Sequence, residues 1–104
     1  MMKVMEITEE QFEKEVINEK KEVLVDFYAN WCGPCKMLRP VLEDVAKENN
    51  NIKIVSIDVD EAESLAMSYE VFSIPCLIKF KDGKEEKRSV GFKPREEIEK
   101  LIGE

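Results

Sequence analysis

At residues 31–36 the chain reads Trp31-Cys32-Gly33-Pro34-Cys35-Lys36, with two thiols separated by a Gly-Pro pair. Residues 23–28, just before it, are almost continuously apolar and rich in β-branched and aromatic side chains. This composition is expected for a strand covered on both faces of a parallel sheet. After the motif, apolar residues recur every three or four positions, which predicts one face of a helix. These residues are Met37, Leu38, Val41, Leu42, Val45 and Ala46. The two cysteines therefore lie where a buried strand turns into a helix.

This location favours a reactive thiolate at Cys32. The first turn of a helix presents unpaired backbone N–H groups and the positive end of the helix dipole, which favour the anion over the thiol. Cys35 follows about one turn later, close enough to close a small disulfide ring and deeper in the fold. Pro34 suits an early helix position because its missing N–H has no intrahelical partner there, and Gly33 permits close approach. We interpret the pair as a reversible dithiol/disulfide centre.

The composition of the chain limits the kinds of protein in which this centre can occur. The 104 residues, 43% of them apolar, suit one domain over residues 1–104. A net charge of −7 without a contiguous basic stripe argues against a nucleic-acid surface. No run is apolar and long enough to cross a membrane, and residues 1–6 lack the apolar core of a signal peptide, so we expect a cytoplasmic protein. Three cysteines in a reducing compartment favour a catalytic, redox or metal role over a disulfide framework.

Strand-like and helix-like runs alternate along the rest of the chain. Strands are expected at residues 4–7, 22–28, 52–59, 74–80 and 85–90, and helices after the capping-box pattern at Thr8, at 34–49, from Asp60 and from Pro94. The second and third strands should be parallel, because a helix connects them as a crossover. An Asp82-Gly83 turn should return the last strand antiparallel. The pattern predicts an α/β fold with a mixed sheet.

Several motifs together resemble the thioredoxin family. They are Trp-Cys-Gly-Pro-Cys-Lys at 31–36, Val-Asp-Phe-Tyr-Ala at 25–29, Ile-Pro at 74–75, Phe-Lys-Asp-Gly at 80–83 and Val-Gly at 90–91. They occur in the family's order over nearly the whole chain. The resemblance implies a thioredoxin fold: a central mixed sheet of about five strands flanked by four helices, the active site after the second strand, and a cis peptide bond before Pro75.

The resemblance also implies an activity. Cys32 would attack a substrate disulfide and Cys35 would resolve the mixed disulfide, so that the protein acts as a general protein-disulfide reductase and electron carrier. A thioredoxin reductase would restore the dithiol, and clients would include proteins such as ribonucleotide reductase, peroxiredoxin and methionine sulfoxide reductase. Such proteins work as monomers. The chain has no Gly-x-Gly-x-x-Gly fingerprint, so we expect no bound cofactor.

Asp26 is the second residue that the pattern singles out, because it is an acid in the middle of a buried strand and the one residue that breaks the apolar run at 23–28. Burial should raise the pKa of its carboxyl, which can then accept the proton that Cys35 loses. The alternative is a carboxyl satisfied by a local hydrogen bond or by water. The family's buried aspartate aligns with Asp26 and has the acceptor role. Many members pair it with a lysine on the neighbouring strand, but here the matching residue is the uncharged Ser56.

The resemblance places a substrate-docking surface around the cysteines. Ile74 and Pro75 would face the disulfide, and the backbone of Ile74 would pair with an extended client segment. Trp31, Gly33, Pro34 and Gly91 would complete this shallow surface. Without the resemblance, Pro75 would be interpreted as an ordinary proline at the start of an edge strand, Trp31 as a core side chain and Gly91 as a glycine at the end of a strand.

Cys76 stands where family members commonly carry threonine. We interpret it as a small buried strand residue; the alternative is a thiol that exchanges with the active-site pair. Strand alternation argues against that exchange, because Cys76 should point away from the face of Pro75.

Two other classes of function remain open. A metal module could use Cys32, Cys35 and Cys76, although structural zinc usually takes four ligands and we expect no metal. A redox-inactive binding module could use the same docking surface.

Overall fold

Five strands form one mixed sheet in the computed structural model, which describes residues 3–103. They are β1 (Met5–Glu6), β2 (Glu22–Tyr28), β3 (Ile52–Asp58), β4 (Cys76–Lys81) and β5 (Lys84–Val90), in the spatial order β1-β3-β2-β4-β5. Strands β1, β3 and β2 are parallel, whereas β4 is antiparallel to both β2 and β5. This confirms the predicted crossover. Residues 1, 2 and 104 of the domain predicted for residues 1–104 lie outside the described residues. Residues 1 and 2 also belong to the segment 1–6, which lacks the apolar core of a signal peptide.

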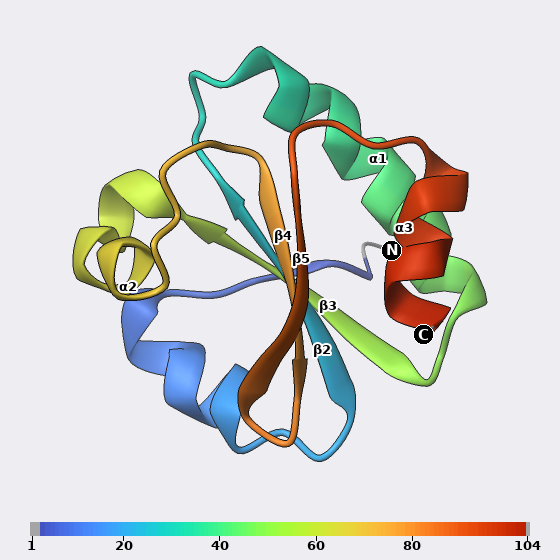
Figure 1. The fold of residues 1–104 in the computed structure, drawn as a ribbon, viewed down its shortest axis with the longest axis horizontal. Helices are drawn as coiled ribbons and strands as arrows, with labels where there is room; N and C mark the ends of the chain where they lie inside the picture. Colours follow the sequence, from blue (N-terminus) through green and yellow to red (C-terminus); the bar gives the residue numbers. More distant parts are fainter. Residues whose placement is uncertain (1–2, 104) are drawn as a thin grey trace.

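Helical segments cover both faces of this sheet. They are α1 (Gly33–Glu48), α2 (Glu63–Ser68), α3 (Arg95–Gly103) and residues 9–17, with a short 3₁₀ turn at Val59–Glu61 before α2. Helices α1 and α3 lie on one side of the sheet, and α2 and residues 9–17 lie on the other (Figure 1). The family's arrangement of a mixed sheet flanked by four helical segments is thus confirmed for residues 3–103. Within the same residues, no helix is long and apolar enough to cross a membrane.

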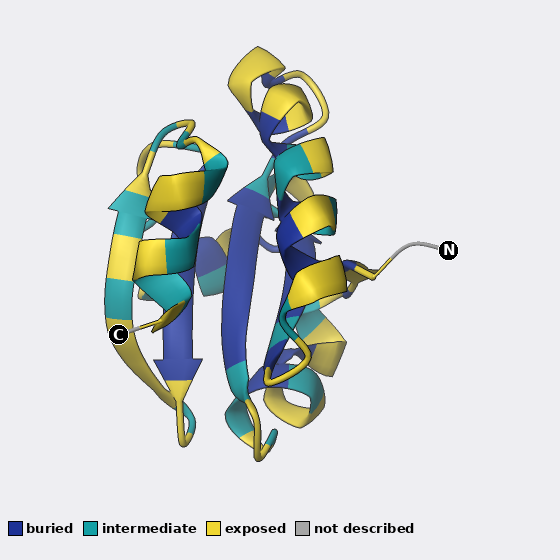
Figure 2. Ribbon diagram, turned by 90° about the vertical axis from the view of Figure 1, so that its right-hand side faces the viewer, coloured by how far each residue is buried: buried dark blue, intermediate teal, exposed yellow. Residues whose placement is uncertain are grey.

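The two faces of the sheet have separate apolar cores. Towards residues 9–17 and α2, the core is aromatic: the ring of Phe80 lies 5.6 Å from that of Phe12 and 5.3 Å from that of Tyr69. Towards α1 and α3, it is built from aliphatic side chains such as Leu42 and Ile98. The central strands β2, β3 and β4 are buried almost throughout, as the dark blue strands of Figure 2 show. Their nearly continuous apolar runs reflect this double cover.

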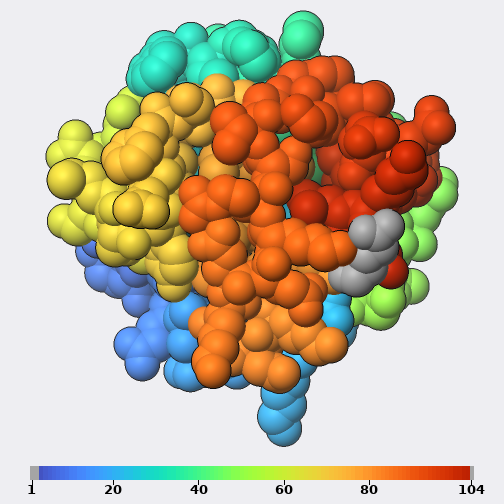
Figure 3. All heavy atoms as spheres, viewed as in Figure 1, coloured from blue at the N-terminus to red at the C-terminus, as the bar shows by residue number. Residues whose placement is uncertain are grey.

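Strand β5 differs because it forms an edge of the sheet. Most of its side chains are exposed or half-buried, and the β4–β5 hairpin occupies the centre of the surface in Figure 3, beside α3. The hairpin turns through Asp82 and Gly83, both with positive φ (54° and 79°), as the two-residue turn predicts. A Cβ on Gly83 would lie 2.8 Å from the carbonyl oxygen of Ile17. Glycine therefore serves both the turn and its packing against residues 9–17.

Some element boundaries differ from the predicted ones. Residues 9–17 form a 3₁₀ turn and a π-helical turn instead of a regular helix, although the side chain of Gln11 reaches back to the Thr8 N–H (2.9 Å) as the capping box predicts. Strand β4 begins at Cys76, after Pro75, which has no N–H for the ladder. Lys79 within β4 is buried, and its ammonium lies 3.1 Å from carboxylate oxygens of both Glu22 and Glu86.

Candidate redox-active site

The two cysteines of the motif lie at the start of α1 and are joined by a disulfide bond, with their Cα atoms 5.3 Å apart. Cys32 is the N-cap of α1, and its own N–H donates to the carbonyl of Ala29, just after β2 (3.2 Å). The backbone N–H of Cys35 donates to the Cys32 sulfur (3.2 Å). The structure therefore directs a helix N-terminal N–H at the sulfur atom predicted to carry negative charge in the reduced protein.

The burial of the pair differs in detail from the sequence-based expectation. Cys32 is 5% exposed and Cys35 is 4% exposed, so the expected greater depth of Cys35 amounts to very little. The physical reason is that sulfur atoms bonded to each other share the same cover. That cover comes from three separate parts of the chain, because Tyr28, Val59 and Ile74 pack against the two cysteines and Ala29.

Ile74, Pro75 and Gly91 lie together beside this disulfide. The Ile74–Pro75 peptide bond is cis, as the family resemblance implies. The N–H of Gly91 donates to the carbonyl of Pro75 (2.7 Å), which ties the end of β5 to the start of β4. Gly91 has a φ of +94°, in a backbone region that residues with a Cβ atom rarely adopt. The predicted Ile74–Pro75 pair and the predicted Gly91, 16 residues after Pro75, are thus brought to one place.

Trp31 is a surface residue, since 70% of it is exposed. Its indole N–H donates to a carboxylate oxygen of Asp60 (2.9 Å), which holds the ring against the turn that follows β3. Sequence reasoning did not identify Asp60, because no pattern marks one acid among the 23 of this chain. Two exposed apolar residues, Met67 and Phe72, were also not singled out; they are 72% and 82% exposed.

Asp26 is buried in the sheet and is only 1% exposed. Its partner in register on β3 is Ser56, whose hydroxyl donates to one carboxyl oxygen (3.3 Å). The other oxygen, Oδ1, has no hydrogen-bond partner among residues 3–103. Burial, the dominant cause, raises the pKa of the carboxyl from 3.8 to about 7, against a smaller opposing effect of Arg39 and of the Ser56 hydrogen bond. The predicted rise is confirmed in direction, and the acid can titrate near neutral pH.

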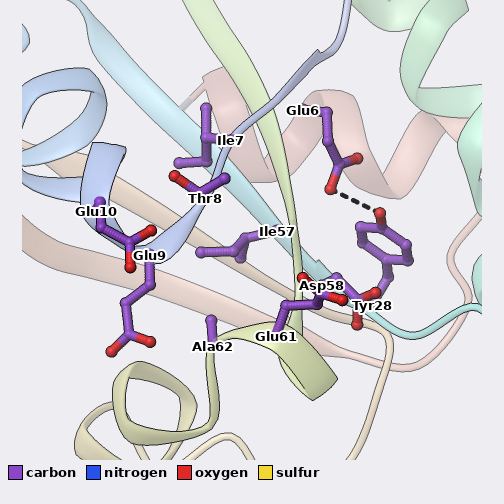
Figure 4. A pocket seen from close by; sticks show the side chains of 10 residues that line it. All are labelled: Glu6, Ile7, Thr8, Glu9, Glu10, Tyr28, Ile57, Asp58, Glu61 and Ala62. Carbon is purple, nitrogen blue, oxygen red and sulfur yellow. Dashed lines mark hydrogen bonds between the residues drawn. The ribbon is translucent and has the colours of Figure 1, made fainter.

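Three further side chains, which were not predicted, contact one another on the same face of the sheet as this acid. The Tyr28 hydroxyl donates to one oxygen of the Glu6 carboxylate (2.6 Å), and the Arg39 guanidinium lies 3.6 Å from the other. Arg39 also lies over the Tyr28 ring, 5.1 Å from its centroid. Figure 4 shows Glu6 and Tyr28 pointing toward each other at one end of a pocket of about 530 Å³. The pocket is rich in carboxylates, but no described group of three or more His, Cys, Asp or Glu residues is arranged to hold a metal ion.

Cys76 belongs to the other face of the sheet. It is 1% exposed, is not disulfide-bonded and packs in the aromatic core with Phe27 and Phe80. Burial raises the pKa of its thiol. The interpretation of Cys76 as a buried core residue therefore fits the structure. The three thiols do not converge on one site, which argues against a metal module built from them.

Comparisons with known proteins agree with this geometry. A family model described as "Thioredoxin" matches residues 3–104. A thioredoxin from Bacillus subtilis (strain 168) is 46% identical over 102 residues, which cover 97% of this chain and 96% of that protein. A thioredoxin from Chlamydia trachomatis is 55% identical over 80 residues (77% and 78%), and one from Mycoplasmoides gallisepticum is 44% identical over 88 residues (85% and 88%).

Proposed function

Because this chain belongs to the thioredoxin family and has its protein-disulfide reductase function, we propose specific roles for the residues of its site. Cys32 is the nucleophile. The observation that carries this assignment is the Cys35 N–H directed at the Cys32 sulfur at the first turn of α1. This N–H and the helix dipole stabilise a Cys32 thiolate more than a thiol. A thiolate at Cys35 has no corresponding place at the N-cap.

The reaction transfers two electrons to the client in two exchanges. The Cys32 thiolate attacks one sulfur of the client disulfide, which forms a mixed disulfide and releases the second client sulfur as a thiolate. The Cys35 thiolate then attacks the Cys32 sulfur, which breaks the mixed disulfide and releases the first client sulfur. The client is reduced to a dithiol, and the protein is left with the Cys32–Cys35 disulfide seen in the structure.

Asp26 is the proton acceptor for Cys35. Before Cys35 can attack, its thiol must lose a proton, and a base with a pKa near 7 suits that transfer at neutral pH. The unpartnered Oδ1 of Asp26 has a lone pair available for the proton.

Clients dock on the surface around the disulfide, where Trp31, Gly33 and Pro34 are exposed and Ile74 and Gly91 are half-buried. Trp31, Gly33 and Pro34 form one side of this surface, and Ile74, Pro75 and Gly91 form the other. Support comes from the exposure of Trp31 and from the packing of Ile74 against the cysteines. An extended client segment pairs with the backbone of Ile74, so that the client disulfide lies over Cys32.

The family places this chain between a reductase and disulfide-bearing proteins. We propose that a thioredoxin reductase returns the Cys32–Cys35 disulfide to the dithiol, and that clients include ribonucleotide reductase, peroxiredoxin and methionine sulfoxide reductase. The protein works as a single-domain monomer in the cytoplasm, without a bound cofactor or metal.

Trapping the mixed disulfide tests the division of roles. The Cys35→Ser variant should remain covalently linked to a disulfide-bearing client such as insulin, because the resolving thiol is absent. The Cys32→Ser variant should form little adduct and should lose client reduction. Non-reducing electrophoresis and mass spectrometry identify the linked cysteine. If Cys32→Ser forms an adduct through Cys35 as fast as Cys35→Ser forms one through Cys32, the proposed division of roles is wrong.

A further inference from the structure

Three polar side chains form a row across the sheet beneath α1. Glu6 on β1 is in register with Ser56 on β3, and Ser56 is in register with Asp26 on β2. Side chains in register on neighbouring strands point to the same face of a sheet. That face is the one covered by α1, because Leu24, two residues before Asp26, packs against that helix in the aliphatic core.

Arg39 is the cation that α1 places at the end of this row. It follows Cys35 by four residues, so both lie on one side of the helix, and both line a pocket of about 260 Å³ beside the disulfide. The guanidinium is held by the Glu6 carboxylate and by the ring of Tyr28, which is two residues after Asp26 on the same face of β2. Among residues 3–103, no ion pair joins Arg39 to Asp26 itself. Its charge is therefore held near the acid without contact.

The charges that face Asp26 come from different elements and act in opposite directions. Within residues 3–103, Arg39 on α1 lowers the pKa of the carboxyl and Glu6 on β1 raises it. Ser56 on β3 contributes a neutral hydrogen bond, which also lowers it. On β4 the residue in register with Asp26 is the apolar Leu77, and Lys79, two positions later, is paired with Glu22 and Glu86. The cation of β3, Lys53, is paired with Glu15 and Glu19 and is not among the groups that act on this carboxyl. Among residues 3–103, Arg39 supplies the positive charge that opposes the effect of burial on this pKa.

We propose that Arg39 is a positioning residue for Asp26: its guanidinium, held by Glu6 and Tyr28, keeps the carboxylate ionised often enough to take the proton of Cys35. The proposal rests on the proposed role of Asp26 as the proton acceptor. It assigns to α1 the positive charge that Ser56 cannot provide. Arg39 itself touches neither the client nor the reacting sulfur atoms.

The size of the effect follows from the geometry. A cation within about 4–6 Å of a carboxylate lowers its pKa by about 1–3 units. Because Arg39 forms no ion pair with Asp26, we expect an effect at the lower end of this range, roughly one unit. With a pKa of about 7, half of the Asp26 carboxyls are ionised at neutral pH. A rise of one unit would leave about a tenth ionised, which lowers the supply of acceptor about fivefold.

The test compares Arg39→Met, which removes the charge and keeps an apolar stem, with Arg39→Lys, which keeps the charge. Carbon-13 NMR of the Asp26 carboxyl, in the oxidised protein where neither active-site thiol titrates, should show the midpoint rising by roughly one unit in Arg39→Met and by much less in Arg39→Lys. Arg95→Met is the matched control, because Arg95 is paired with Glu48 and Glu99 through α3 and its loss changes the net charge equally. Its midpoint should stay in place. An equal shift in Arg95→Met and Arg39→Met, or no shift in Arg39→Met, would overturn the proposal.

A kinetic readout separates this proposal from the one on which it rests. The release of the client from a preformed Cys32 mixed disulfide should be about fivefold slower in Arg39→Met at neutral pH and should recover as the pH rises by about two units. If the Asp26 midpoint moves but the rate profile does not, Asp26 is not the acceptor, and the role of Arg39 in the reaction is overturned with it. If Asp26→Asn slows release while Arg39→Met leaves the midpoint unchanged, only the Arg39 proposal fails.

Discussion

Replacing Asp26 by asparagine should stabilise the fold in alkaline solution and change it little in acid. Asparagine has nearly the same shape but never carries a charge. The wild-type carboxyl is 1% exposed and bonded only to Ser56 among residues 3–103, so its ionised form lacks the solvation that water provides in the unfolded chain. The substitution removes that cost wherever the carboxyl would be ionised.

The sign and the magnitude both follow from the pKa. The unfolded chain releases this proton near pH 3.8, whereas the folded protein keeps it until about pH 7. Between these values the folded state binds more protons than the unfolded state, so the free energy of unfolding of the wild type falls as the pH rises. About three units, at about 1.4 kcal/mol each, amount to about 4 kcal/mol. Above about pH 8 the loss is complete, and the advantage of Asp26→Asn should level off.

Urea unfolding of the oxidised proteins at several pH values measures this difference. The free energy of unfolding of Asp26→Asn minus that of the wild type should grow from its value near pH 4 by about 4 kcal/mol near pH 8. Asp44→Asn, on the exposed side of α1, is the control for the loss of one negative charge and should show no such growth. A difference for Asp26→Asn that stays constant with pH would refute the reasoning, because the carboxyl would then have the same pKa folded and unfolded.

Two further predictions concern the turn and the third thiol. Gly83→Ala should lower the free energy of unfolding by about 2 kcal/mol or more, because its φ is +79° and the new Cβ would lie 2.8 Å from the Ile17 carbonyl oxygen. Gly103→Ala, with open space around the site, should change it by less than about 0.5 kcal/mol, so equal losses in the two variants would contradict this account. In native oxidised protein Cys76 should resist alkylation by iodoacetamide and should react in urea, and Cys76→Ala should keep the rate of client reduction. Rapid alkylation of native Cys76 would show that the aromatic core does not cover it.

Local patterns were enough to predict most of the framework. The strand at 22–28 was predicted with its observed ends, and the Asp82-Gly83 hairpin was confirmed, because apolar runs and turn residues act over a few positions. The place of the two cysteines between a strand and a helix was confirmed for the same reason. Residues 9–17 were less predictable: apolar spacing fits any helical form, and packing against the sheet selected a 3₁₀ and a π turn there.

The surroundings of Asp26 were predicted only in part. One acid in an apolar strand is enough to predict its burial and a raised pKa, because both depend only on where that residue lies in the strand. The position of the Arg39 charge could not be predicted in this way. Glu6, Tyr28 and Arg39 come from three elements and meet only when β1, β2 and α1 are assembled. Each of these residues looks like an ordinary charged or aromatic surface residue in the sequence. Trp31 and Asp60 are a second pair of this kind, joined across 29 positions of the chain.

The spacing of Cys32 and Cys35 has a consequence for the life of the protein through its redox cycle. The two cysteines are three residues apart in sequence, so the bond between them closes a small ring at the first turn of one helix. Chain-entropy arguments assign roughly 2 kcal/mol to so small a ring, less than half of what a bridge across a whole domain contributes. The sheet and its two cores hold the chain together in either oxidation state. Thus the molecule can open and close its one sulfur–sulfur bond at every turnover while its architecture is carried entirely by non-covalent packing.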